Sequence, residues 1–341
     1  MLWLSLRHCE LRLPYVIAIA VALRALLLFA EPRLSGDVYR YLSDGRVLAS
    51  GHNPYAYTPG DPRINHPEIR SIYLPYAQLL FAAVHQLTAW RLLIVAFDLG
   101  AIVLLRRHGF AYAIFPPLLF EGTWSGHIDA IAGVLLAIAL LRGSGAAAAF
   151  ASGMKIIPFA AVPALLRQTQ HRARFILMFA VALLVPIVPF LRGPLMPGFR
   201  DYATRWIFNS PLYDLLFPII DRIPTKEIWT HHPLRFQFLS DFVYRHLYTD
   251  FLTRAVMATI AIGLIACARK ASTAIAALLL CSPAIHPWYW LVLVPASLIE
   301  RRQWVLVALC APFSYMLYDH APAFFVYALC YGVVAAVCIY R

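Results

Sequence analysis

The chain has 341 residues, of which 61% are hydrophobic and 13% are charged, and its formal net charge is +12. Soluble domains are typically about 45–50% apolar and about 25% charged, so this composition excludes an ordinary soluble fold. A basic excess can indicate nucleic-acid binding, but here the basic residues gather between hydrophobic segments, as topology determinants do. We therefore expect membrane lipids, and no nucleic acid, among the partners.

The first apolar run, residues 13–30, follows Arg7 and Arg12 and lacks a clear small-residue cleavage site. This pattern predicts a signal anchor that remains as the first membrane span. Arg24 lies in the middle of this run, and Asp98 lies in the middle of the next long one. Charges at such depth are costly unless they are paired, so we expect Arg24 and Asp98 to form a buried ion pair between neighbouring helices.

A helix needs about 17–25 apolar residues to cross a bilayer. The expected hydrophobic helices cover residues 13–30, 89–106, 110–121, 126–141, 145–154, 156–167, 174–191, 251–268, 271–284, 287–300, 303–318 and 321–340. A further apolar stretch, 73–88, would place several arginines on the outer side if it crossed the membrane, so we expect it to lie along the outer surface.

With this assignment the positive charges fall on the cytoplasmic side, and both termini are cytoplasmic. Two long loops, 31–88 and 192–250, then face outward. The predicted fold class is all-α, a polytopic transmembrane helix bundle of about 11–13 hydrophobic helices with surface helices in the outward loops. We expect one transmembrane domain, 1–341, in a bacterial inner membrane with its polar motifs facing the periplasm.

The first outward loop opens with a helix that is predicted to begin at Asp37, directly after Gly36. Residues 37, 40, 41 and 44 share one face by helical spacing, which would carry Asp37, Arg40, Tyr41 and Asp44. This stripe can serve acid–base chemistry or bind a charged group. The alternative is a helix cap at Asp37 with a solvated Arg40–Asp44 ion pair.

Lys155 separates two short apolar segments that we interpret as half-helices, because neither is long enough to be a full span. A lone ionisable side chain at membrane depth is a functional candidate, and a phosphate ligand would supply the missing anion. The alternative is a lysine whose ammonium group reaches the outer interface.

Two histidines lie in other polar stretches. His286 stands between Pro283 and Pro287, ahead of an aromatic cluster, and can polarise a carboxylate or contact a phosphate, while a structural histidine is the alternative. His127 and Asp129 are two residues apart, so on a helix they would point to different faces and would not form a metal pair. The six cysteines lack metal-ligand spacing, and no nucleotide-binding loop is present, so we expect neither a metal nor a cofactor.

Several short motifs occur in a fixed order along most of the chain. They are Gly36-Asp37-Val38-Tyr39, Asn53-Pro54-Tyr55, Tyr73-Leu74-Pro75-Tyr76-Ala77-Gln78, Gly126-His127-Ile128-Asp129-Ala130, Lys155 with Pro158, and Ser282-Pro283 followed by His286-Pro287-Trp288-Tyr289. This ordered set resembles the GT-C superfamily of membrane glycosyltransferases. More closely it resembles the bacterial polyprenol-phosphate-mannose-dependent mannosyltransferases, and at the first loop it is similar to the eukaryotic glycosylphosphatidylinositol mannosyltransferase.

The resemblance implies an inverting transfer of one hexose, mannose by the nearest similarity, from a polyprenyl-phosphate sugar to a glycolipid or glycan acceptor. It implies that Asp37 is the general base and that His286 assists it. Lys155 or Arg40 would hold the donor phosphate, and the other substrate-binding positions would be Tyr41, Asp44, Asn53, His127 and Tyr289. Many members carry paired acids in the first loop, whereas Asp37 has no acidic neighbour, which also argues against a metal.

Two other function classes compete with an enzyme. Broken helices and intramembrane charges suit a transporter or lipid flippase, which usually has two similar halves, but residues 1–170 and 171–341 show no similarity to each other. A non-catalytic scaffold subunit would make both Asp37 and Lys155 dispensable.

Overall fold

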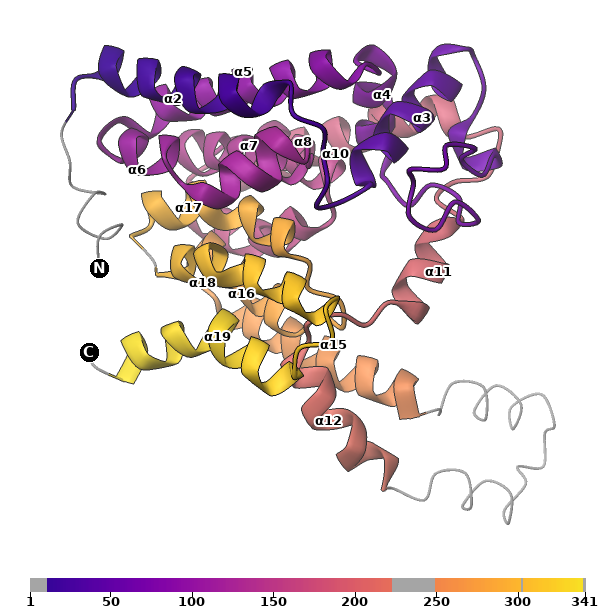
Figure 1. The fold of residues 1–341 in the computed structure, drawn as a ribbon, viewed down its shortest axis with the longest axis vertical. Coiled ribbons are helices and arrows are strands. Elements are labelled where there is room, and N and C mark those ends of the chain that lie inside the picture. The colour runs from indigo at the N-terminus through magenta and orange to yellow at the C-terminus, as the bar shows by residue number, and fades with distance from the viewer. Residues whose placement is uncertain (1–10, 223–248, 302, 340–341) are drawn as a thin grey trace.

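The structure is a computed structural model that describes residues 11–222, 249–301 and 303–339 (Figure 1). Across these residues the secondary structure is helical without strands, and one isolated bridge joins Phe208 to Ala284. The expected all-α class is therefore confirmed for the described part of the chain. Our expectations for Arg7 and for the middle of the second loop fall on residues 1–10 and 223–248, outside the described residues.

Most of the helices follow one another with few residues between them, and the long loop 57–74 separates η1 from α4. In chain order they are α2 (Leu13–Leu28), α3 (Asp37–Ala49), η1 (Pro54–Ala56), α4 (Pro75–Ala83), α5 (Leu87–Leu105), η2 (Arg106–His108), α6 (Gly109–Ala113), η3 (Leu118–Trp124), α7 (Asp129–Arg142), α8 (Gly145–Met154), η4 (Ile157–Ala161), α9 (Val162–Gln168), α10 (Arg172–Leu184), η5 (Val185–Phe190), α11 (Gly198–Arg205), α12 (Pro211–Asp221), α15 (Thr249–Cys267), α16 (Ala271–Leu280), η6 (Pro287–Leu293), α17 (Val294–Ile299), α18 (Trp304–Cys310), η7 (Ala311–Leu317) and α19 (Ala323–Ile339).

Three helical stretches in the described residues are long and apolar enough to cross a membrane: Leu87–Ala113, Arg172–Phe190 and Thr249–Cys267. The pair η3 and α7, bent by 111°, would make a fourth if it forms one span. Shorter apolar helices of 10–17 residues account for most of the remaining hydrophobic segments. These findings indicate a membrane protein, as the composition predicts.

Most expected segments coincide with observed helices, but residues 110–121 do not form one. The chain instead makes the five-residue α6 and then the π-helical turn η3. A Cβ on Gly109 would lie 2.7 Å from the Ile102 carbonyl oxygen, so this glycine allows α6 to pack closely against α5.

The two halves of the chain form adjoining groups of helices in Figure 1, with α2, α5, α7 and α8 in one and α15 to α19 in the other. Helix α7 packs against α5 and α8 on one side and against η6 and α17 on the other. Gly133 lies at this junction, where a Cβ would be 2.8 Å from the Leu291 carbonyl oxygen. Close packing along α7 therefore joins the two groups.

The predicted ion pair between the first two long segments is confirmed. Arg24 Nε donates to Asp98 Oδ2 at 2.9 Å, and both side chains are buried. Tyr112 Oη donates to Asp98 Oδ1 at 2.8 Å, and Arg24 Nη1 donates to the Ala113 carbonyl at 3.0 Å. The pair thus ties α2 to α5 and to α6.

Helix α3 begins at Asp37 after Gly36, as predicted, and one of its faces is buried in the protein. Its residues from Val38 to Leu42 are buried, and a Cβ on Gly45 would lie 2.2 Å from the Phe81 carbonyl oxygen. Helix α4, against which it packs, has nine residues and is about 14 Å long, too short to cross a bilayer. The loop containing both helices is a packed part of the fold.

Candidate functional site

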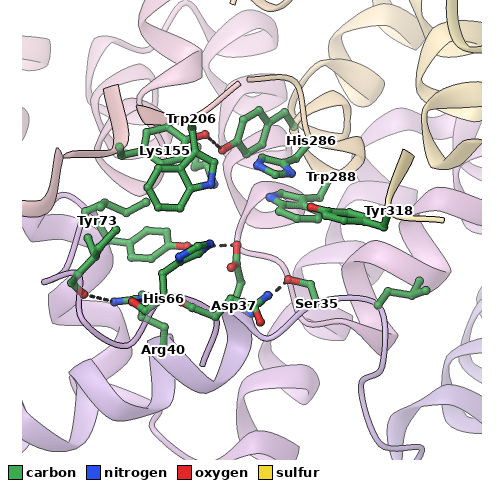
Figure 2. Close-up of a pocket in the computed structure, with 16 residues that line it drawn as sticks. Ser35, Asp37, Arg40, His66, Tyr73, Lys155, Trp206, His286, Trp288 and Tyr318 are labelled. Carbon is green, nitrogen blue, oxygen red and sulfur yellow. Dashed lines mark hydrogen bonds between the residues drawn. The ribbon is translucent and has the colours of Figure 1, made fainter. Parts of the chain in front are cut away.

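A cavity of about 590 Å³ opens where four regions of the chain meet (Figure 2). These regions are α3 with the loops on either side of it, the break after α8, the helix α11 with its C-cap, and the segment around η6, and Tyr318 at the end of η7 completes the lining. The lining residues are Leu34, Ser35, Asp37, Arg40, Asn65, His66, Ile69, Ile72, Tyr73, Lys155, Tyr202, Trp206, His286, Trp288, Tyr289 and Tyr318.

Asp37 reaches this cavity from the first turn of α3, with 27% of its side chain exposed. Its backbone N–H donates to Ser35 Oγ at 3.2 Å, and Tyr73 Oη donates to its Oδ2 at 3.4 Å. Burial raises the pKa of Asp37 above its usual range, although the nearby charges of Lys155 and Arg40 act in the opposite direction. A carboxylate with a raised pKa is a stronger base than an ordinary exposed one.

Lys155 enters the cavity from the break between α8 and η4, where its backbone is extended. The predicted break is confirmed, and the Lys155 side chain is buried in the protein, where it lines the cavity. Its Nζ lies 3.3 Å from Asp129 Oδ2 and 4.6 Å from the centroid of the Tyr289 ring. An ammonium group has three donors, so this pairing leaves capacity for a further anion.

Asp129 and His127 lie directly behind the cavity wall and do not share a helix, contrary to the assumption made from their spacing. Helix α7 begins only at Asp129, and Gly126 turns the preceding chain with φ +79°. His127 lies behind the cavity wall, fully buried, with its Nδ1 atom 3.9 Å from Asp37 Oδ2. The sequence interpretation missed Asp129 as the partner of Lys155 because helical spacing does not apply across this turn.

A row of stacked rings runs along one wall of the cavity. His127 stacks on Trp288 at 4.1 Å between centroids, and Trp288 stacks on His286 at 4.5 Å. His286 in turn stacks on Phe208 at 4.8 Å, and Phe208 stacks on Tyr318. Burial lowers the pKa of His286 to about 3, so its imidazole is neutral at physiological pH and can donate or accept a hydrogen bond.

Arg40 lines the cavity, but its guanidinium already binds backbone carbonyls. It donates to Ile69 at 2.7 Å, to Asn65 at 2.9 Å and to His66 at 2.8 Å. These bonds hold the turn that forms one rim of the cavity, and Trp206 from the second loop packs edge-on against His66. The two long loops therefore close over the site together.

Four of the predicted substrate-binding residues lie outside the cavity lining: His127, which is buried behind the wall, and Tyr41, Asp44 and Asn53. Tyr41 is buried and stacks on Phe81 at 4.7 Å. Asp44 is buried and accepts from Gln78 Nε2 at 3.0 Å, so a solvated Arg40–Asp44 ion pair does not form. Asn53 caps η1 by accepting from the Tyr55 N–H. Their expected contact with substrate remains a prediction, whereas Asp37, Arg40, Lys155, His286 and Tyr289 do converge.

A second, apolar pocket of about 150 Å³ adjoins the first. The residues that line both are Ile72, Tyr73, Lys155, Tyr202 and Tyr289. Beyond Lys155 its walls are mainly apolar and include Met154, Ile156, Ile157, Phe199, Leu278 and Leu279. Tyr202 and Tyr289 share a short hydrogen bond between their hydroxyl groups at this boundary.

Within the described residues no group of three or more His, Cys, Asp or Glu side chains is arranged to hold a metal ion. Comparison with family models, curated proteins and solved structures finds no match to this chain.

Proposed function

We propose that this protein is an integral membrane glycosyltransferase. It moves one hexose, mannose by the resemblance, from a polyprenyl-phosphate sugar to a glycolipid or glycan acceptor. The observation that carries the proposal is that Asp37 and Lys155 share one cavity, and that an apolar pocket begins at Lys155.

The two pockets match the two parts of such a donor. The polar cavity has room for a sugar, and the apolar pocket suits the first units of a polyprenyl chain. The phosphate between them would lie at Lys155, beside the hydroxyl groups of Tyr202 and Tyr289. Charge-assisted hydrogen bonds from an ammonium group suit a phosphate, and aromatic walls suit the apolar face of a sugar ring.

The reaction then proceeds as one displacement. The acceptor hydroxyl oxygen forms a bond to the anomeric carbon while the bond from that carbon to the phosphate oxygen breaks, and its electron pair stays on the phosphate. Asp37 takes the proton of the acceptor hydroxyl and later releases it to solvent. Lys155 stabilises the departing phosphate, so no general acid is required. Figure 2 shows Asp37 and Lys155 contributed by separate parts of the cavity wall, as attack opposite the leaving group requires.

We further propose that the chain forms a polytopic bundle whose cavity opens to the periplasm, with both termini in the cytoplasm. The support is that Trp90, at the start of the long helix α5, packs against Tyr41 of the helix that carries Asp37, whereas Arg106 and Arg107 follow the opposite end of α5, as the positive-inside rule requires. Arg142 precedes the start of α8, whereas Lys155 follows its end at the cavity. Arg142 is therefore also on the side away from the cavity.

The test uses the full chain purified and reconstituted in lipid vesicles. The protein is incubated with polyprenyl-phosphate mannose and a membrane glycolipid extract, and released polyprenyl phosphate is measured. Asp37→Asn is expected to lower the rate by roughly 10²–10⁴-fold, the usual contribution of a general base. Asp61→Asn is the matched control, because this carboxylate lies in the same loop but pairs with Arg63 outside the cavity.

Release that survives in Asp37→Asn would mean that another group is the base. No release from any of several polyprenyl-phosphate sugars by folded protein would refute the enzyme and favour a transporter or a scaffold. Flux of a labelled lipid or solute through the same vesicles would separate those two.

A further inference from the structure

A chain of buried polar groups runs from Asp37 away from the cavity into the protein. His127 Nδ1 lies 3.9 Å from Asp37 Oδ2, and His127 Nε2 lies 3.6 Å from Glu121 Oε2. Tyr315 Oη donates to the same Glu121 oxygen at 3.0 Å. Glu121 lies on η3 and His127 lies in the turn before α7, so two separate elements bring them behind the base.

Both ring nitrogens of His127 are buried and, among the described residues, have no partner within hydrogen-bonding distance. Their nearest polar neighbours are the two carboxyl groups, at distances slightly beyond a hydrogen bond. Stacking on Trp288 holds the plane of the ring. Catalytic hydrogen bonds are often long without substrate and shorten when it binds.

If Glu121 and His127 share one proton, two protonation states fit these distances. Either the imidazole is doubly protonated beside a Glu121 carboxylate, or Glu121 is protonated and donates to Nε2 of a neutral ring. In both states Nδ1 carries a hydrogen that points to Asp37. A neutral ring with its hydrogen on Nε2 would instead turn a lone pair toward the Asp37 carboxylate.

We propose that Glu121 and His127 form a positioning pair that holds Asp37 in its working orientation through an N–H on Nδ1. This inference rests on the proposed function, in which Asp37 is the base. Within the described residues, the side-chain contacts from both Tyr73 and His127 go to Oδ2. The pair thereby leaves Oδ1 to accept the hydrogen of the acceptor hydroxyl.

The pair predicts that the rate falls at high pH. This fall is additional to the one at low pH, where Asp37 becomes protonated. Loss of the shared proton leaves Nδ1 without its hydrogen, and the orientation of Asp37 is lost with it. The other titratable groups that face the pair are Lys155, His286, Asp129 and Tyr315. An amide at position 121 would donate to Nε2 at every pH and remove the fall at high pH.

The activity test compares matched variants of the full chain in vesicles. His127→Leu is expected to lower kcat by about 10–100-fold with little change in donor KM, the usual effect of losing a hydrogen bond to a charged group. His127→Asn should recover part of the loss, because its amide nitrogen takes the place of Nδ1. Glu121→Gln should extend activity to higher pH, whereas Glu121→Leu should resemble His127→Leu. An unchanged pH profile in Glu121→Gln, or full activity in folded His127→Leu, would overturn the proposal.

A readout without catalysis separates this proposal from the function on which it rests. In protein labelled with ¹⁵N-histidine, the signals that His127→Asn removes belong to His127, and Nδ1 should be protonated near neutral pH in the wild type and in Glu121→Gln. An unprotonated Nδ1 would overturn the positioning pair even if sugar transfer is observed. A protonated Nδ1 in a protein that transfers no sugar would leave the pair intact and refute the proposed function. Glu121→Gln is isosteric, so it stays informative if the leucine variants do not fold.

Discussion

Two sets of charged residues lie in the apolar body of this protein, and they differ in what surrounds them. Arg24 and Asp98 are enclosed by α2, α5 and α6, and both oxygens of Asp98 accept hydrogen bonds. Asp37 and Lys155 instead border a cavity of about 590 Å³. A buried charge whose partners close around it ties helices together, whereas one that faces a cavity can still meet a ligand.

The comparison shows why an ionisable residue within an apolar segment is not by itself evidence of a site. Arg24 and Lys155 stand equally isolated in the sequence, and each proves to have a carboxylate partner. Only Lys155 also lies over an aromatic ring at the boundary between a polar and an apolar pocket. The two residues carry the same charge, and they differ in whether a cavity lies beside them.

The largest effect that would sharpen this contrast concerns stability. Arg24→Leu should destabilise the protein by about 3–5 kcal/mol, because Asp98 is left as a buried, unpaired charge. The double variant Arg24→Leu/Asp98→Leu should recover most of this loss. Thermal unfolding in detergent measures both, and the rate of sugar transfer per folded molecule should not change. If the folded double variant loses sugar-transfer activity, the Arg24–Asp98 pair takes part in the reaction, and the contrast between the two sets of charges is wrong.

Lys155 should behave in the opposite way. Lys155→Met is expected to lower kcat/KM for the donor by about 10–100-fold, because a charge-assisted hydrogen bond to the phosphate is lost. It also leaves Asp129 unpaired, so Lys155→Met/Asp129→Asn should regain stability without regaining activity. Initial rates and unfolding temperatures of the two variants provide the test. Recovery of activity in the double variant would reduce Lys155 to a structural partner of Asp129.

His286 should contribute less, because its buried imidazole is neutral. Its pKa of about 3 lies below the working range, so His286→Asn should lower the rate by about tenfold, through the loss of one hydrogen bond to the substrate, and should leave the fall in rate at low pH where it is. Rates between pH 5 and 9 for the variant and the wild type provide the check. A shift of the fall at low pH in His286→Asn would show that this residue controls the ionisation of Asp37 after all.

The smallest effect is a pH shift at Asp37. In the proposed reaction Asp37 acts in its ionised form, and burial raises its pKa. Activity should therefore fall with decreasing pH at a higher pH than for an ordinary carboxyl group, whose pKa is ~3.9. The raised pKa of Asp37 also determines how the stability of the fold changes with pH. A carboxyl whose pKa is raised by folding stabilises the fold below its unfolded pKa, and that contribution is lost as pH rises through the folded pKa.

Asp37→Asn should therefore unfold at a slightly higher temperature than the wild type at neutral pH while losing activity. Asp61 is the control of opposite sign, because Arg63 lowers its pKa to about 2 and its contribution is lost only in strong acid. A lower unfolding temperature for Asp37→Asn would mean that the ionised carboxylate stabilises the fold, contrary to this account.

Local features of the fold could be predicted from the sequence. Apolar length placed most helices within a few residues, Gly36 and Asp37 marked the start of α3, and two mid-segment charges predicted the Arg24–Asp98 pair. Each of these depends on near neighbours in the chain or on the high cost of an unpaired charge in an apolar environment. Both constraints apply before any particular tertiary arrangement is known.

The composition of the site was decided by the tertiary structure. Tyr202 and Trp206 line the same cavity as Asp37 because the second loop packs on the first. Gly198 lies against the Arg70 carbonyl at this contact. Glu121 and Asp129 lie directly behind the site because Gly126 ends the helical geometry between them, so helical spacing no longer predicts where each side chain points. The sequence by itself determined which charges need partners and where helices begin and break. Which partner each charge meets, and whether a cavity remains beside it, depend on packing between residues far apart in the chain, which no local pattern encodes.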